Sequence, residues 1–244
     1  MQLQGNTGII TYLNNIFNKK CWYHYRKYGI IYDDKKYGEM NILLNIIFDI
    51  GEVLVDFSWS VLMKRLFDEE TALRVTEATW KNPDWIEFDK GNLTDEEVLK
   101  LLIKKAPDLE MEIRTAFSRI GEVLTKKETT IPLIKRLKSE GYGVYYLSNY
   151  FEFLMHAAPQ PLDFIPYTDG GIFSCHEHLV KPDREIYLRL CSRYGLSPEE
   201  CIFIDDREKN VRGAESAGMK GIVYTGQTPD ELCGEIYRRV ANPT

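Results

Sequence analysis

The most restrictive feature of the sequence is an apolar run that ends in a carboxylate. The run Ile42–Phe48 has the length of a β-strand and is rich in isoleucine, which is typical of a strand buried on both faces. Such strands belong to parallel sheets that helices cover on each side. Because the run is followed directly by Asp49, the sequence predicts an acidic side chain at the edge of a buried sheet.

Further strand-length runs alternate with helical patterns along the rest of the chain. The other predicted strands are Val144–Leu147, Ile172–Phe173, Cys201–Ile204 and Ile222–Tyr224. The predicted helices, each followed directly by a glycine that can end it, are Pro132–Glu140, Arg184–Tyr194 and Asn210–Ala217. Strands that alternate with helices predict an α/β fold with a doubly wound, Rossmann-like parallel sheet.

The segment 57–128 breaks this alternation, because it contains helical patterns and no convincing strand. The sequence Thr94–Glu97 is a capping box that opens a run of apolar residues at helical spacing. A second amphipathic stretch covers Leu109–Leu124. We therefore predict a helical cap domain at 57–128, inserted into an α/β core formed by residues 41–56 and 129–244.

Residues 1–40 form an N-terminal extension of uncertain structure. Residues 1–39 carry six Lys or Arg and three Asp or Glu, so this segment is basic although the whole chain is acidic. One hypothesis is that translation begins at Met40, directly before the first strand. The alternative is a basic arm with an unknown partner, and an intact Met1 peptide in native protein would exclude the first hypothesis.

Charge and cysteine usage limit the partners that we expect. A net charge of −6 argues against nucleic acid. The five cysteines are scattered without a C-x-x-C pair, which favours reduced thiols. No apolar run approaches the ~20 residues that span a bilayer, and the N-terminus lacks the pattern of a signal peptide. We expect a cytoplasmic protein without a nucleic-acid or membrane partner, and the pattern fixes no oligomeric state.

Polar residues follow the predicted strands. Asp49 ends the first strand, Ser148 and Asn149 end the second, Lys181 lies in the loop after the third, and Asp205 and Asp206 end the fourth. In open parallel sheets, ligands bind beyond the carboxyl ends of the strands. Taken alone, each of these residues except Asp49 is more readily interpreted as a turn, cap or surface residue. Together, carboxylates, an ammonium and a hydroxyl suit a divalent metal ion and a phosphoryl group.

The ordered segments FDIGEVLVDF, YLSNY, VKPDREIY and FIDDREKN resemble the four motifs of the haloacid dehalogenase (HAD) superfamily. The resemblance covers roughly residues 42–225 and indicates the subgroup with a helical cap after the first motif. Within that subgroup, the motifs are most similar to those of bacterial sugar-1-phosphate phosphatases, the α-D-glucose-1-phosphate phosphatase among them. The resemblance implies a Mg²⁺-dependent phosphatase that hydrolyses a small phosphate monoester.

The resemblance also implies a role for each matching residue. Asp49 would attack phosphorus and form an aspartyl-phosphate that water hydrolyses. Ser148, with Asn149, would bind the phosphoryl oxygens. Lys181 would neutralise charge on the phosphoryl group and on the nucleophile.

The implied Mg²⁺ ligands are carboxylates and one backbone oxygen. Asp206 would ligate the ion with Asp49 and the backbone carbonyl of Gly51, and Asp205 would support the metal site. Mg²⁺ prefers such oxygen ligands and keeps several waters, so few carboxylates suffice. The ion would offset the repulsion between an anionic nucleophile and an anionic substrate.

Gly51 departs from the family pattern. Many phosphatases of the family carry a second aspartate at this position, two residues after the nucleophile, and it acts as general acid and base. Glu52 is one position away, and we expect it to face elsewhere. General acid–base catalysis typically contributes ~10²–10⁴-fold. We therefore hypothesise a substrate whose leaving oxygen is relatively acidic, such as a sugar 1-phosphate.

Two other kinds of protein would show similar motifs. A metal-independent 2-haloacid dehalogenase also has an Asp nucleophile without a second Asp, but its last motif is rich in Ser and Asn. Here that motif holds Asp205 and Asp206, which would repel a carboxylate substrate unless a cation lay between them. A non-catalytic binding protein on the same fold is the second rival. The argument against it is the combined presence of Asp49, Ser148, Lys181 and Asp206.

Two other patterns are given no site role. The sequence Cys175–His178 (CHEH) is interpreted as a solvated loop. The aromatic residues Trp80, Trp85 and Phe88 are interpreted as helix core, since aromatic residues at such spacings usually pack inside a helical layer.

Overall fold

The computed structural model describes residues 44–241, and its centre is a five-stranded parallel sheet. The order across the sheet is β5-β4-β1-β6-β7. The strands are β1 (Asn45–Phe48), β4 (Gly143–Ser148), β5 (Gly170–Phe173), β6 (Cys201–Asp205) and β7 (Lys220–Val223). The predicted doubly wound α/β fold is confirmed. The N-terminal extension 1–40 and the proposed start at Met40 lie outside the described residues.

Strand β1 lies in the middle, where the winding of the sheet changes direction. Its Asn45 is in register with Gly143 of β4 on one side and with Cys201 of β6 on the other. Sequential strands then continue outward on each side, to β5 and to β7. In sheets of this kind, such a reversal opens a crevice at the carboxyl ends of the strands. The end of β1 therefore lies at the position where a ligand is expected.

Helices cover both faces of the sheet because β1 alternates its side chains between two cores. Ile46 and Phe48 belong to one cluster, together with apolar residues of α8 (Thr130–Ser139) and α13 (Pro229–Ala241). Ile47 belongs to the other cluster, with residues of α11 (Arg184–Tyr194) and α12 (Glu208–Ser216). The sequence analysis had not predicted α13. A strand buried on both faces needs a layer of helices on each side of the sheet, as the apolar run of the sequence indicated.

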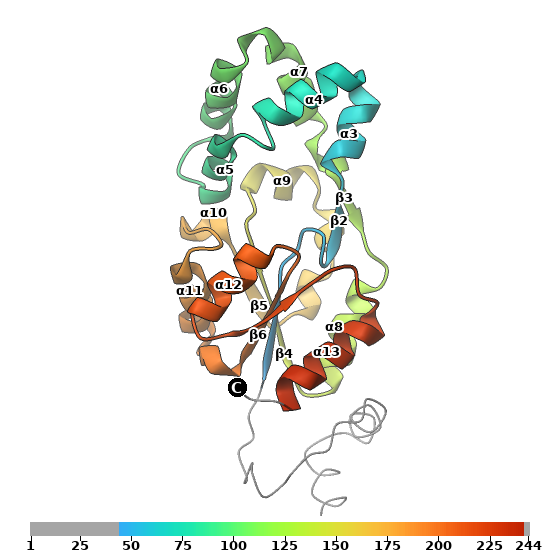
Figure 1. Ribbon diagram of the computed structural model, residues 1–244, viewed down its shortest axis with the longest axis vertical. Coiled ribbons are helices and arrows are strands. Elements are labelled where there is room, and N and C mark those ends of the chain that lie inside the picture. Colours follow the sequence, from blue (N-terminus) through green and yellow to red (C-terminus); the bar gives the residue numbers. More distant parts are fainter. Residues whose placement is uncertain (1–43, 242–244) are drawn as a thin grey trace, which may run out of the picture.

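Five helices gather at one end of the molecule, above the carboxyl ends of the strands (Figure 1). These cap helices are α3 (Trp59–Leu66), α4 (Glu69–Ala78), α5 (Ile86–Lys90), α6 (Asp95–Lys105) and α7 (Glu110–Ser118). The predicted capping box is present, since Thr94 accepts a bond from the backbone of Glu97 and the Glu97 side chain accepts one in return. The division into a cap at 57–128 and a core remains a prediction.

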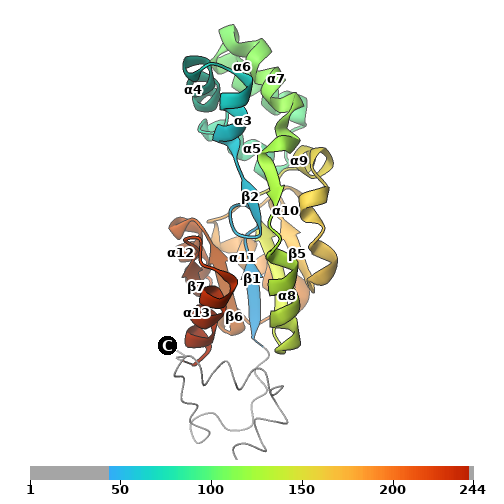
Figure 2. The same ribbon diagram turned by 90° about the vertical axis from the view of Figure 1, so that its right-hand side faces the viewer.

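The chain enters and leaves the cap helices through a two-stranded antiparallel ribbon (Figure 2). Strand β2 (Val55–Phe57) pairs with β3 (Leu124–Lys126). The expectation of no strand within 57–128 was wrong at its end, where β3 lies. A three-residue strand is too short to show a period in the sequence. Leu124–Lys126 is recognised as a strand only by its pairing with β2.

Shorter helices complete the described chain. Two of them are α9 (Glu152–Ala157) and α10 (Ser174–Glu177). The 3₁₀-helices are Pro83–Trp85, Pro107–Leu109, Ile120–Val123, Gln160–Leu162, Ile165–Tyr167 and Pro198–Glu200.

The interpretation of the CHEH sequence as a solvated loop was wrong. Its first three residues lie in α10, where Glu177 is buried and forms ion pairs with Arg189 and Arg193. A buried carboxylate needs such partners, and they come from the next helix, α11, which packs back on α10.

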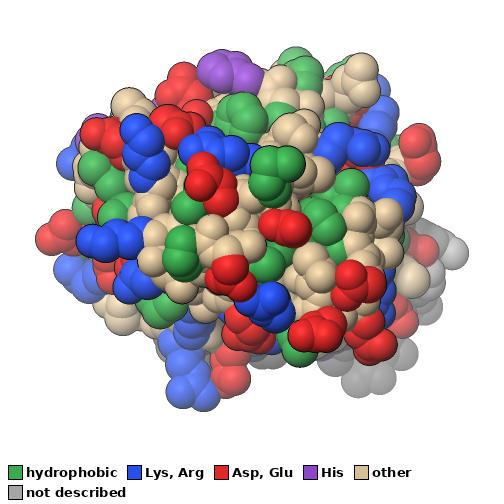
Figure 3. Space-filling model, turned by 90° about the horizontal axis from the view of Figure 1, so that it is seen from above, with side chains coloured by type: hydrophobic (Ala, Val, Ile, Leu, Met, Phe, Trp, Pro, Cys, Tyr) green, Lys and Arg blue, Asp and Glu red, His purple; other side chains and the backbone are tan. Residues whose placement is uncertain are grey.

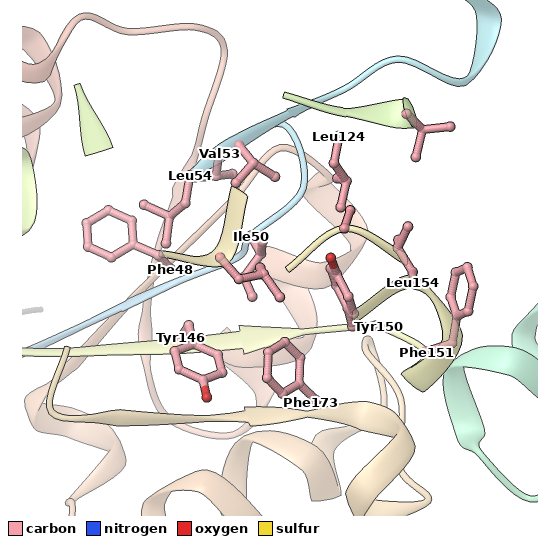
Figure 4. Close-up of a cluster of buried hydrophobic side chains, with 14 of the residues drawn as sticks. Phe48, Ile50, Val53, Leu54, Leu124, Tyr146, Tyr150, Phe151, Leu154 and Phe173 are labelled. Atoms are coloured by element: carbon pink, nitrogen blue, oxygen red, sulfur yellow. The ribbon is translucent and has the colours of Figure 1, made fainter. Parts of the chain in front are cut away.

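The core and the cap helices share one apolar cluster. Phe48 at the end of β1 and Ile50 just after it belong to the same cluster as Leu124 of β3, Phe151 and Leu154 of α9 (Figure 4). This continuous packing ties the base of the cap to the end of the sheet where the polar residues lie.

The surface of the cap end is mixed in charge. Acidic and basic side chains are interspersed there, with apolar side chains between them (Figure 3). Within residues 44–241, no helix has both the length and the apolar character that crossing a bilayer requires.

Candidate active site

Asp49 follows β1 directly and lies at the centre of a hydrogen-bond network. Its backbone N–H donates to the carbonyl oxygen of Ile204 at 2.8 Å, so β6 fixes its backbone. Its Oδ1 accepts bonds from the backbone N–H of Ile50 at 2.7 Å and from Ser148 Oγ at 2.7 Å, and lies 2.8 Å from Lys181 Nζ. No donor among the described residues contacts Oδ2. One carboxylate oxygen is therefore held in place while the other is free to react or bind a metal ion.

Lys181 joins two strand ends through one buried ammonium group. Its Nζ lies 2.8 Å from Asp49 Oδ1 and 2.7 Å from Asp205 Oδ2, and the side chain is 1% exposed. Burial alone would lower the pKa of the lysine, but Asp205 and Asp49 together raise it. Lys181 therefore stays charged, and it compensates two carboxylates that β1 and β6 bring together.

Asp205 has its hydrogen-bond capacity largely filled by protein donors. The backbone N–H of Arg207 donates to Oδ1 at 2.8 Å, and the amide of Asn210 lies 3.0 Å from both carboxylate oxygens. Together with Lys181, these donors leave Asp205 as a fixed support. The neighbouring Asp206 accepts no such set of bonds, so it is the freer carboxylate of the pair.

Asn149 holds the loop that carries Lys181. Its side-chain amide donates to the carbonyl oxygen of Lys181 at 3.1 Å and accepts from the backbone N–H of Lys181 at 2.7 Å. The same loop packs closely on α12, because a Cβ at Gly213 would come within 2.4 Å of the Pro182 carbonyl oxygen. The sequence analysis predicts that Asn149 binds the substrate; in the structure it lines the cavity and its amide also positions the lysine.

Three carboxylates gather beside this lysine. Oxygens of Asp49, Asp205 and Asp206 all lie within 4.8 Å of one another. Burial raises the pKa of Asp49 to about 6, with Lys181 opposing the rise and Asp205 adding to it. Burial, followed by the charge of Asp205, also raises the pKa of Asp206. One ammonium does not balance three carboxylates, and the hard oxygen donors fit a divalent cation such as Mg²⁺.

A cavity of about 450 Å³ opens above these groups. Asp49, Gly51, Ser148, Lys181 and Asp206 form part of its floor. Its other walls include a set of aromatic rings from β2, the cap helices and the segment after β4. These rings belong to Phe57, Trp59, Trp80, Trp85, Tyr150 and Phe151.

The cavity corrects two expectations. Trp80 and Trp85 line it, although their spacing suggested helix core alone. Trp85 has both functions, because it is also buried against Phe88 at 5.3 Å between ring centroids. Glu52 also lines the cavity, so the expectation that it faces elsewhere was wrong. That these three residues line a cavity becomes visible only when the cap is packed against the core.

The described part of the chain matches a family model over residues 44–218, and the description of that model is haloacid dehalogenase-like hydrolase. The chain belongs to this family. The match contains all seven residues that the sequence analysis assigned to the site. It also contains the cap helices, so cap and core are parts of one hydrolase.

Two curated relatives of the hydrolase are named as a hydrolase and as a phosphatase. One is a chloroplast flavin mononucleotide hydrolase from Arabidopsis thaliana, 29% identical over 152 residues, which are 62% of this chain and 60% of the relative. The other is a sesquiterpene phosphatase from Aspergillus oryzae, 27% identical over 179 residues, which are 73% of this chain and 88% of the relative. The hydrolase therefore spans less than two thirds of the first relative.

Solved structures share the fold of the hydrolase. A HAD-family enzyme from Bacteroides thetaiotaomicron, in complex with magnesium and inorganic phosphate, matches with a TM-score of 0.59 and 20% identity, over 78% of this chain and 98% of that one. A dehalogenase matches with a TM-score of 0.57 and 21% identity, over 83% and 99%. Phosphate-binding and dehalogenase structures match equally well, so the site must decide between the two reactions.

Replacing Lys181 by methionine tests how far the network depends on its ammonium group. Removing one partner of a buried ion pair leaves uncompensated charge, so we expect Lys181→Met to lower the free energy of unfolding by about 3–5 kcal/mol. Urea denaturation in metal-free buffer measures this. The matched control is Lys126→Met, which breaks the exposed pair with Asp163 and costs under ~1 kcal/mol. Equal losses in the two variants would contradict the proposed dependence.

Proposed function

We propose that the hydrolase is a Mg²⁺-dependent phosphatase that acts on a small phosphate monoester through an aspartyl-phosphate intermediate. The observation that carries this proposal is the cluster of Asp49, Asp205 and Asp206 around a single buried lysine. Such a site attracts a divalent cation and, with the cation present, a phosphoryl dianion.

The chain's own residues fit the steps of phosphoryl transfer. Asp49 Oδ2, which no described donor contacts, is the attacking oxygen, and the bond from phosphorus to the ester oxygen breaks. The hydroxyl of Ser148 and the ammonium of Lys181 are placed to bind phosphoryl oxygens as charge develops. Mg²⁺, held by Asp49, Asp206 and the Gly51 carbonyl, would supply positive charge that offsets anionic repulsion.

The two rival functions fit these residues less well. A 2-haloacid carries its own carboxylate, which three neighbouring aspartates would repel. A non-catalytic protein would not require one oxygen of a buried aspartate to be fixed while the other stays free. Both arguments rest on the geometry of the site, since the fold is shared by proteins with different reactions.

We further propose that the leaving group has an apolar or planar face. The aromatic rings in the cavity wall offer such a group extended contact. The polar groups among them are partly occupied, since Thr76 accepts from Trp59 Nε1 at 3.1 Å and Lys81 binds Glu77 at 2.6 Å. The names of the two relatives, with a flavin nucleotide and a sesquiterpene as substrates, support this class.

A sugar 1-phosphate is the second candidate for the substrate. The motif resemblance and the missing aspartate at Gly51 favour it, and the apolar face of a pyranose also packs on aromatic rings. A clear preference for glucose 6-phosphate over glucose 1-phosphate would remove this candidate. A cytoplasmic location is proposed as well, supported by the four cysteines of the described residues, which are all free thiols.

Asp49→Asn is the direct test of the proposed reaction. We expect wild-type protein with Mg²⁺ to hydrolyse phosphate monoesters, and the variant to be slower by roughly 10⁴-fold or more because the nucleophile is lost. Removing Mg²⁺ with EDTA should abolish wild-type turnover, and adding Mg²⁺ should restore it. Phosphate release measures both effects. The control Asp163→Asn removes a surface carboxylate and keeps full activity.

Two outcomes would contradict the proposal. Turnover that persists in Asp49→Asn would exclude Asp49 as the nucleophile. Release of halide from a 2-haloacid in the presence of EDTA, without phosphatase activity, would establish the dehalogenase instead.

Trp80→Ala tests the class of leaving group. Losing one aromatic contact should raise the KM for flavin mononucleotide by roughly tenfold, which is about 1.4 kcal/mol of binding, and leave kcat nearly unchanged. Steady-state kinetics measures this, with Leu73→Ala on the exposed face of α4 as the control. An unchanged KM, together with a lower KM for glucose 1-phosphate, would favour the sugar phosphate.

A further inference from the structure

The cap contributes a carboxyl group to the cavity, on a residue that the sequence analysis did not single out. Asp89 lies in α5 and lines the same cavity as Asp49 and Lys181. Within residues 44–241, no hydrogen bond or ion pair joins Asp89 to another side chain. An acid that is surrounded by protein and has no structural partner is available to a ligand.

Protein surrounds Asp89 closely, although the side chain reaches the cavity and is only partly buried. Burial raises the pKa of its carboxyl to about 7. The positive charges of Arg207 and Lys181 lower this pKa, and the negative charge of Asp49 raises it further. Near neutral pH, Asp89 can therefore both give and take a proton, which suits a general acid and base.

The neighbours of Asp89 fix its place above the floor of the cavity. On one side, the Phe88 ring packs against Phe151 of the core at 5.1 Å between centroids. On the other side, the carbonyl oxygen of Lys90 lies 2.9 Å from His178 Nδ1.

Gly91 ends α5 at the same contact. It adopts φ +62°, and a Cβ there would come within 2.5 Å of the Cys175 carbonyl oxygen. Only glycine permits this conformation together with so close an approach. The helix end is thus seated on the core of the hydrolase directly beside Asp89.

Position 51 has room for the acid that it lacks. A Cβ at Gly51 would meet no atom within 4 Å, so the absence of an acid there is not imposed by packing. Glu52 also lines the cavity, and burial raises the pKa of its carboxyl. It is nevertheless exposed to solvent, whereas Asp89 is partly buried. Asp89 is the better-placed acid for the leaving oxygen.

We propose that Asp89 is the general acid and base of the reaction, supplied by the cap in place of the acid missing at Gly51. This inference rests on the proposed phosphatase function. It makes the seating of α5 on the core part of the chemical step, because this contact holds the proton donor in the cavity. A relatively acidic leaving oxygen is then no longer required.

The two half-reactions balance in protons. In the first, Asp49 bonds to phosphorus, the ester P–O bond breaks, and the leaving oxygen takes the electron pair and the proton of Asp89, giving an alcohol. In the second, Asp89 accepts a proton from water as the water oxygen bonds to phosphorus. The bond to Asp49 then breaks, which gives inorganic phosphate, the free nucleophile and protonated Asp89.

The test compares two esters that share a ring and differ in the leaving oxygen. Asp89→Asn should lower kcat/KM for 4-nitrobenzyl phosphate, an alkyl ester that needs a proton, by roughly 10²–10⁴-fold. For 4-nitrophenyl phosphate, whose phenolate leaves without protonation, the same variant should lower kcat/KM by less than about tenfold. It should instead release a burst of nitrophenolate, because hydrolysis of the intermediate has lost its base.

Two further variants sharpen the comparison. Glu87→Gln makes the same chemical change on α5, at a residue that pairs with Lys90 outside the cavity, and keeps wild-type kinetics. The double variant Gly51→Asp with Asp89→Asn returns an acid to the site from the core side, and we expect it to recover activity on the benzyl ester.

The pH dependence gives a second readout. For the benzyl ester, wild-type kcat/KM should fall as the pH rises through about 7, because the acid loses its proton, and this fall should be absent in Asp89→Asn. Wild-type and variant are compared directly because other charged groups also face the cavity. These are Asp49, Glu52, Lys81, Lys181, Asp206 and Arg207.

Stability gives a readout that is independent of activity. A carboxyl whose pKa is raised on folding costs stability as the pH rises from its ordinary pKa towards the folded value. Asparagine carries no charge, so Asp89→Asn should melt at a higher temperature than wild-type protein at pH 8, and the difference should shrink towards pH 5. A purely structural Asp89 would instead give a variant that melts lower.

The proposal is overturned if Asp89→Asn lowers kcat/KM equally for both esters, or leaves the benzyl ester unaffected. Loss of benzyl activity in Glu52→Gln instead would assign the role to Glu52. In each case, wild-type hydrolysis of the two esters still supports the phosphatase function. Absence of wild-type turnover of any phosphate ester would reject that function itself.

Discussion

The site depends on one buried ammonium group shared by two carboxylates. Lys181 binds Asp49 at the end of β1 and Asp205 at the end of β6, so it fixes the distance between adjacent strand ends. Asn149 and the close packing at Gly213 hold its loop in turn. Ile50, Ser148 and Lys181 all contact one oxygen of Asp49, so its other oxygen is left for the attack that we propose.

In the reaction that we propose, the cap and the core have different roles. The core supplies the nucleophile, the ammonium and the carboxylates that suit a metal ion, all from the ends of parallel strands. The cap supplies aromatic rings and Asp89, which face the leaving group. Because the residues of the cap line the cavity opposite the polar groups of the core, changes in the cap can alter the substrate while the chemistry at phosphorus stays constant.

The core was predictable from sequence because its signals are local. Runs of apolar residues mark the strands, and polar residues at their ends share one edge of a parallel sheet, so Asp49, Ser148 and Lys181 could be placed together. The β2–β3 ribbon was missed because a three-residue strand shows no period. Trp80, in the turn after α4, and Asp89, in α5, were missed because their roles appear only where the cap packs against the distant core.

The central claim is that these groups hold a divalent cation and a transferring phosphoryl group together. A crystal structure with Mg²⁺ and orthovanadate tests it most directly, since vanadate mimics the five-coordinate phosphorus of the transfer step. The account predicts vanadium bonded to the Asp49 carboxylate, contacted by Ser148 and Lys181, with the metal ion on Asp49 and Asp206. Vanadate bound away from Asp49, or a metal ion that does not contact these carboxylates, would contradict it.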